Sequence, residues 1–348
     1  SKGSTLIAGP SICMDGDAKT LVMPGAGIFG HMLEEAGVST RLDAAWAGSM
    51  RFDDQAGLLV CDGRTAATSS KSIGGVRVQR DMMDASRLEI TLASSAPGTP
   101  TDGTSMMPMA SGRAVSLVRA IGGTAGPAKA ESRTYVGGGG EPVLQQLLYL
   151  ESGIIEADSA AGELRVPGAG KLLAVDRRRA TTAPTTTPGG AMSDSMSETK
   201  GNSLFAWSDS MTLQRASGLA RMIGSVKLVH DRQNGDERVM LECRQLDALL
   251  AMDQPTDSGD ATGSSGRLAN AVATDRVWMR YDGRELTARV LSYDAANDMV
   301  TANGDGSANP VSMLDLSKGT PFNAQSIQWN LSTNRFEARQ MSPIVMPR

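Results

Sequence analysis

The chain contains two copies of one sequence pattern, and this internal repeat limits most strongly what it can fold into. The first copy passes through Pro24-Gly-Ala-Gly27, Trp46-Ala-Gly-Ser-Met50, Ala56-Gly-Leu58 and Gly63. The second passes through Pro167-Gly-Ala-Gly170, Trp207-Ser-Asp-Ser-Met211, Ser217-Gly-Leu219 and Gly224. Repeats on this scale are typical of stacked supersecondary units that share one core.

The residues inside the second copy predict β-strands. From 220 to 229 the chain alternates with a period of two, which places Ala220, Met222, Gly224, Val226 and Leu228 on one face. The Asn-Gly pair at 234–235 then predicts a hairpin. Similar short strands, with turns at 281–283 and 294–297, follow in the C-terminal third. The fold class that we predict is all-β.

Three stretches rich in Pro, Gly, Ser, Thr and Asp predict loops, at 97–112, 181–203 and 254–266. The run 181–203 lies inside the second copy, and an insertion there explains why the tryptophans are farther apart than the Pro-Gly-Ala-Gly elements. We therefore predict a first repeat over 1–160 and a second over 161–348, stacked into one continuous β-structure. Short helices remain compatible with the sequence at 29–37 and 143–150.

Composition and charge exclude several classes of function. The net charge is −4 and the basic residues are dispersed, whereas nucleic-acid binding needs clustered Lys and Arg. The three cysteines, Cys13, Cys61 and Cys243, lack the spacing of a metal site. No apolar run reaches the ~18 residues of a membrane-spanning helix. We predict no metal and no cofactor, and the opening segment, which lacks an initiator Met, reads as part of a processed or truncated chain.

One glycine motif requires a choice between two interpretations. Gly25-Ala-Gly27-Ile-Phe-Gly30 matches the G-x-G-x-x-G of dinucleotide-binding folds. Its second copy, Gly168-Ala-Gly170-Lys-Leu-Leu173, loses the third glycine and continues as a strand. We therefore interpret both as glycine-rich strand corners.

Catalytic residues are hard to assign. The only histidines, His31 and His230, have no local pattern of partners, and we expect His230 at the rim of a strand. The acidic pairs at 34–35 and 53–54 have turn residues as neighbours, and paired acids catalyse only across a defined separation. We therefore rank an enzyme third, after the binding and structural hypotheses given below.

The C-terminal third resembles a known family. The residues that carry this similarity are Val272, Val277, Glu285-Leu-Thr-Ala-Arg-Val-Leu-Ser-Tyr-Asp294, Val300-Thr-Ala-Asn-Gly304, Pro310-Val311, Gly319-Thr-Pro-Phe-Asn-Ala324 and Ile327-Gln-Trp-Asn330. Together they resemble the OstA-like family of lipopolysaccharide-transport proteins, which includes LptA, LptC and the periplasmic part of LptD. The segment 207–250 resembles it too, and the first repeat matches more weakly.

The resemblance implies an elongated, folded-over antiparallel β-jelly-roll, or β-taco. It also implies a role without chemistry, in which the protein binds lipopolysaccharide or another acylated glycan and relays it between membranes. The expected place is the periplasm of a diderm bacterium, in association with the outer membrane. The expected partners are other envelope β-jelly-rolls joined by strand addition, with head-to-tail self-association, and no nucleic acid.

If the interior of such a fold is open, acyl chains lie against its apolar face. The residues that we expect there are Leu59, Cys61, Ala220, Met222, Val226, Leu228, Val300 and Ala302. The second hypothesis is a purely structural envelope protein in which the same face is a filled core. The third is a β-fold enzyme that acts on carbohydrates or esters.

Overall fold

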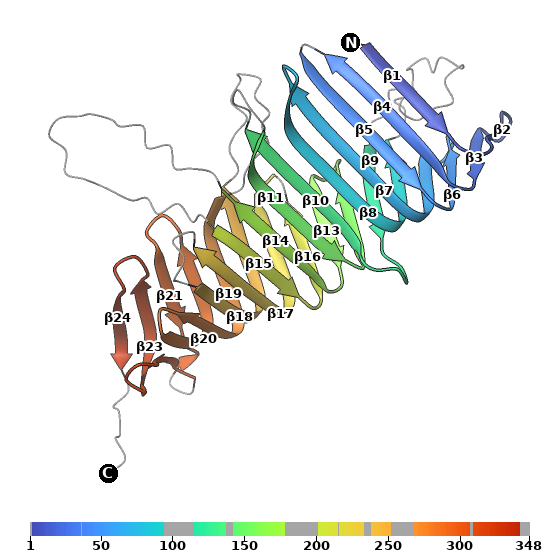
Figure 1. The fold of residues 1–348 in the computed structure, drawn as a ribbon. Coiled ribbons are helices and arrows are strands. Elements are labelled where there is room, and N and C mark those ends of the chain that lie inside the picture. The colour runs from blue at the N-terminus through green and yellow to red at the C-terminus, as the bar shows by residue number, and fades with distance from the viewer. Residues whose placement is uncertain are drawn as a thin grey trace, which may run out of the picture. The chain divides into compact units, whose positions relative to one another are not determined.

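A computed structural model describes residues 2–35, 37–93, 115–136, 142–177, 201–214, 216–232, 238–251, 267–306 and 309–341. These residues form 24 β-strands and no α-helix (Figure 1). The all-β prediction is therefore confirmed. Contacts divide the chain into two units, Ser1–Lys171 with Thr212–Ala216, and Leu172–Met211 with Ser217–Arg348. Two strands, β14 (Gly170–Asp176) and β16 (Ser210–Gln214), lie at this division.

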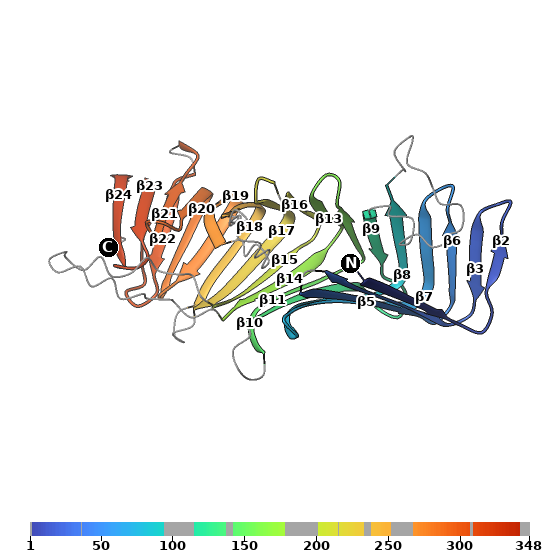
Figure 2. The ribbon, with the colours of Figure 1, turned by 90° about the horizontal axis from the view of Figure 1, so that it is seen from above.

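The strands of the first unit form two rows, because its two longest strands pair with different neighbours along their two halves. Row A contains β2 (Cys13–Asp15), β3 (Thr20–Pro24), β6 (Ser49–Asp53), β9 (Val115–Ile121), β12 (Ile154–Asp158) and β13 (Glu163–Pro167). Row B contains β1 (Lys2–Ala8), β4 (Gly27–Glu35), β5 (Val38–Trp46), β10 (Ala128–Val136) and β11 (Val143–Ser152). The long strands β7 (Leu58–Ile73) and β8 (Val76–Leu92) belong to both rows (Figure 2).

The second unit repeats this arrangement with four long strands, β17 (Leu219–Arg232), β18 (Arg238–Ala251), β19 (Arg267–Tyr281) and β20 (Arg284–Asp294). One half of β20 pairs with β21 (Met299–Asn303) and the other with β22 (Val311–Asp315). Beyond them lie β23 (Thr320–Asn330) and β24 (Arg335–Met341), while β15 (Gly201–Trp207) pairs with the C-terminal half of β17.

Three of the long strands, β7, β17 and β19, change row at a β-bulge, where one extra residue interrupts the register. The bulge of β7 lies at Gly63-Arg64, that of β17 at Gly224-Ser225 and that of β19 at Asp275-Arg276. All six residues have positive φ angles, between 30° and 84°. The bulges divide these three strands into two halves, and the halves of β7 pair with different neighbours.

The repeated sequence elements are the corners between the rows. In the first copy the backbone N–H of Ala47 donates to Gly63 O at 2.7 Å, next to the bulge of β7. In the second copy the N–H of Ser208 donates to Gly224 O at 2.6 Å in the same way. The Pro-Gly-Ala-Gly elements end β3 and β13, and Gly25 and Gly168 have φ angles of 103° and 94°. The repeat therefore encodes the turns that close each corner.

Several sequence predictions require correction or fall outside the described ranges. Residues 29–35 lie in β4 and 143–150 in β11, so neither segment is helical. Cross-strand pairing to both neighbours overrides their weak local preference. Residues 201–203, which we assigned to the insertion, begin β15. The remainder of 181–203, all of 97–112, and 254–266 lie outside the described residues.

Candidate functional site

The first unit has one continuous apolar face. In row A its residues nearest the bulge are no more than 4% exposed, and they lie in register across β3, β6, β7, β8, β9 and β12: Met23, Met50, Cys61, Leu88, Ala120 and Ile155. A second line lies farther from the bulge. Leu21 and Phe52 are buried at one end of it, and the rest of the line is half-buried: Leu59, Ile90, Val118, Ala157 and Leu164. Apolar side chains on this second line therefore keep contact with solvent.

In row B the same face becomes more polar with distance from the bulge. Trp46 and Thr65 are buried beside it. The next line is apolar and half-buried: Phe29, Ala44, Ala67, Met83 and Ala130. The line beyond mixes Leu148, which is 50% exposed, with Ser132, whose hydroxyl donates to Asp81 Oδ1 at 2.6 Å. The face is thus apolar near the bulges and polar toward the far edge.

The opposite face of row A is covered by ion pairs. Arg87 contacts Asp62 at 3.2 Å and Glu89 at 2.7 Å, and Arg119 contacts Glu89 at 3.6 Å and Glu156 at 2.9 Å. Charged side chains keep their hydration only when they face solvent. Only the apolar face is therefore suited to an apolar ligand.

The apolar face of the second unit is packed more tightly. Met222, Val226, Val300 and Ala302 are at most 2% exposed, and Ala220 is buried too. Leu228 is half-buried. Toward the C-terminus the rings of Tyr281 and Trp329 lie 5.5 Å apart, and both are buried. This part of the second unit is a filled core.

Of the eight residues that we expected on an apolar interior, two lie in the first unit and six in the second, and six of the eight are buried. Leu59 and Leu228 alone among them are half-buried. The half-buried line of row B was not predicted from the sequence. The line forms because Phe29 pairs with Ala44 and Ala67 pairs with Met83, and these pairings depend on strand register.

Two of the thiols are buried, and one of the histidines is half-buried beside a serine. Burial raises the pKa of Cys61 to about 12, with a smaller contribution from the negative charge of Asp62. Burial also raises the pKa of Cys243 to about 12. Both thiols therefore stay protonated at neutral pH and are poor nucleophiles. His230 is half-buried within β17, where Nδ1 lies 2.7 Å from Ser203 Oγ.

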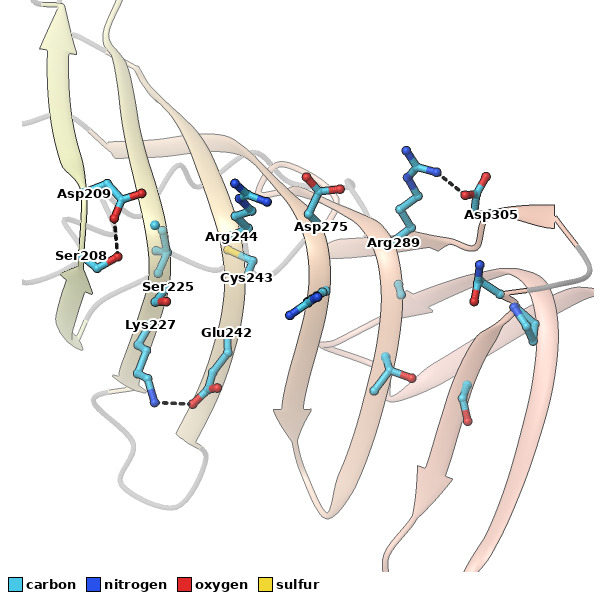
Figure 3. A pocket seen from close by; sticks show the side chains of 18 residues that line it. Ser208, Asp209, Ser225, Lys227, Glu242, Cys243, Arg244, Asp275, Arg289 and Asp305 are labelled. Atoms are coloured by element: carbon cyan, nitrogen blue, oxygen red, sulfur yellow. Dashed lines mark hydrogen bonds and ion pairs between the residues drawn. The ribbon is translucent and has the colours of Figure 1, made fainter.

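An open groove of about 1190 Å³ crosses the second unit at its bulges (Figure 3). Charged side chains of both signs line it, contributed by β17, β18, β19 and β20 and by the corners near 209 and 305. Nothing in the sequence pattern pointed to it, because it forms only where bulges of neighbouring strands align.

Within the described ranges, no three metal-ligating side chains cluster. The same ranges contain no helix that is long and apolar enough to span a bilayer. Comparison of the chain with models of known protein families, and with curated proteins, found no match.

Proposed function

We propose that the protein is a non-enzymatic lipid-binding transport protein that holds acyl chains against the apolar face of the first unit. In this proposal rows A and B are the two walls of a folded-over, OstA-like β-jelly-roll. The cargo is lipopolysaccharide or another acylated glycan, relayed between membranes of a diderm envelope. The observation that carries the proposal is the half-buried apolar second line, which includes Leu59, Ile90 and Val118 in row A and Phe29 and Met83 in row B.

The energetics of such binding are favourable. Each methylene that moves from water onto an apolar face contributes roughly 0.8 kcal/mol. A stretch of about ten methylenes would thus gain roughly 8 kcal/mol, before the cost of ordering the chain. Row B is apolar near the bulges and polar toward its far edge, and this change supports one orientation for every acyl chain. Acyl tails would lie near the bulges, and the polar head would lie near Ser132 and Asp81.

The edges of the sheet support strand addition. Among the described strand pairings, β1 pairs with β4 and β24 pairs with β23, each along one edge. The other edge of such a strand offers backbone groups to an incoming strand. Head-to-tail association with a second copy, or with another envelope β-jelly-roll, would use these edges.

A purely structural role is the second candidate, and the second unit favours it. Met222, Val226, Val300 and Ala302 already fill their face, so an acyl chain could reach them only by displacing packed side chains. An enzyme stays third. The contact of Ser203 with His230 is what supports it, because a hydroxyl beside an imidazole is the start of a nucleophilic pair.

Lipid extraction from the purified protein, followed by mass spectrometry, tests the proposal. The wild-type protein is expected to carry acylated lipid. Ile90→Asn, on the apolar face, should lose it, whereas Thr91→Asn, on the opposite face of β8, should retain it. Circular dichroism establishes that both variants are folded. Folded wild-type protein without lipid, or equal retention by the two variants, would favour the structural role.

A further inference from the structure

The groove of the second unit carries an inference that is independent of the apolar face. It lies along the bulges of β17 and β19 and reaches the corner that follows β21. In Figure 3, Arg244, Asp275 and Arg289 stand on three neighbouring strands with their charged ends on the same side. The groove is therefore lined by a row of charges of alternating sign.

The charges of the groove balance, but they are not all paired. Four cationic and four anionic residues line it: Lys227, Arg244, Arg276, Arg289, Asp209, Glu242, Asp275 and Asp305. Lys227 pairs with Glu242 at 3.0 Å, and Arg289 pairs closely with Asp305.

Three of the remaining charges are available to a ligand, and the fourth, Asp209, accepts a hydrogen bond from the Ser208 hydroxyl at 2.6 Å. Among the described residues, Arg244, Arg276 and Asp275 have no ion-pair partner within 4.0 Å. The arginines on the ion-paired face of the first unit differ, since Arg87 and Arg119 each contact two carboxylates. Arg244, Arg276 and Asp275 are also exposed, so a solute can reach them.

The backbone at Asp275 is left-handed. Asp275 and Arg276 have φ angles of 62° and 55°, a left-handed conformation that disfavours residues with a Cβ. The bulges of β7 and β17 place a glycine, Gly63 or Gly224, at the first of these two positions. Glycine would relieve the strain in β19 as well. What aspartate adds is a negative charge in the row with Arg244 and Arg289.

We propose that this groove binds a zwitterionic group that joins a phosphate to a primary ammonium, as in phosphoethanolamine. Arg244 and Arg276 bind the phosphate oxygens, because guanidinium groups match phosphate geometry. Asp275 accepts hydrogen bonds from the ammonium. A polyanion is disfavoured because four carboxylates line the same groove, and a neutral sugar would find no aromatic ring among its lining residues.

Isothermal titration of the whole chain with O-phosphoethanolamine tests the proposal. Arg244→Gln and Asp275→Asn are each expected to weaken binding about tenfold or more, because each removes a charged hydrogen-bonding partner. Asn tolerates the left-handed backbone, so Asp275→Asn changes the charge alone. Arg221→Gln is the matched control, since Arg221 is paired with Asp247 at 2.8 Å and does not line the groove.

The comparison ligands decide the class of the group. Inorganic phosphate and ethanolamine should each bind more weakly than phosphoethanolamine. Equal binding of inorganic phosphate and phosphoethanolamine would overturn the zwitterionic assignment. Binding that survives both variants, or none at all, would overturn the site.

Vesicles identify the source of the group. Sedimentation with phosphatidylethanolamine vesicles, and not with phosphatidylcholine vesicles, assigns the group to a lipid headgroup, since choline has no N–H to donate. Binding in solution without sedimentation assigns it to a soluble ester. Loss of lipid from the first unit would leave these results unchanged, so the two proposals can fail separately.

Discussion

The indole Nε1 of Trp46 donates a hydrogen bond of 3.2 Å to the carbonyl oxygen of Gly25. This bond ties the end of β5 to the corner between β3 and β4, and both residues belong to the repeated pattern. The ring also lies so close to Gly27 that a Cβ there would be 2.4 Å from Trp46 Cζ2. Packing against Trp46 therefore accounts for glycine at position 27, and this explanation needs no bound dinucleotide phosphate.

The first prediction concerns Gly27→Ala. The added methyl group collides with a buried indole, so the variant should lose roughly 1–3 kcal/mol of unfolding free energy. Gly30→Ala in the same strand is the control, since its Cβ would meet only Asp43 Oδ1 at 3.5 Å. Urea unfolding followed by tryptophan fluorescence measures both. Equal stability of the two variants would contradict the corner packing.

A second prediction concerns the strained bulge of β19. Asp275→Gly should raise the unfolding free energy by about 1 kcal/mol, because glycine adopts the left-handed conformation without strain. Asp247→Gly is the control, since Asp247 has no positive φ angle and pairs with Arg221. That change should destabilise the protein. Thermal unfolding separates the outcomes, and a lower stability of Asp275→Gly would refute the strain.

The third prediction concerns alkaline pH. Folding raises the pKa of the Cys61 and Cys243 thiols from 9.0 to about 12, because burial disfavours the thiolate. The folded state therefore holds these protons more tightly than the unfolded state. Their contribution to stability is complete below about pH 9 and is lost as pH rises toward about 12, by at most ~1.4 kcal/mol per pH unit for each thiol.

Urea unfolding at a series of pH values above 9 checks this loss, and the variant with both cysteines changed to Ala should show a shallower decline. Alkylation of the folded protein provides the accompanying control. Exposed Cys13 should react, whereas Cys61 and Cys243 should react only after unfolding. Rapid modification of all three thiols in the folded state would contradict the burial.

Much of the strand pattern was predictable from the sequence, because side chains on a strand alternate between faces. Ala220, Met222 and Val226 are buried as the period of two predicts, and the two-residue turn Asp282-Gly283 connects β19 to β20. The corner interpretation of Gly25–Gly27 is also correct. These features depend on neighbouring residues alone.

The features that were missed depend on residues far apart in the chain. The bulge at Asp275-Arg276 has no local signal, because neither residue favours a left-handed backbone as glycine does. The groove needs several such interruptions to align across β17, β18 and β19, and the half-buried line through Phe29 and Met83 needs the register of five strands. A short helix was compatible with the sequence at 29–37, but residues 29–35 pair with strands on both sides.

The most direct test of acyl binding compares a photo-crosslinker at Leu59 with one at Val60. Both native residues are apolar neighbours on β7, but successive side chains of a strand point to opposite faces, so only position 59 lies on the apolar face. Protein purified after irradiation should carry covalently attached acylated lipid when the crosslinker is at position 59, and none when it is at position 60. Equal labelling at both positions, or labelling at neither, would contradict acyl binding and leave the apolar face as a structural core.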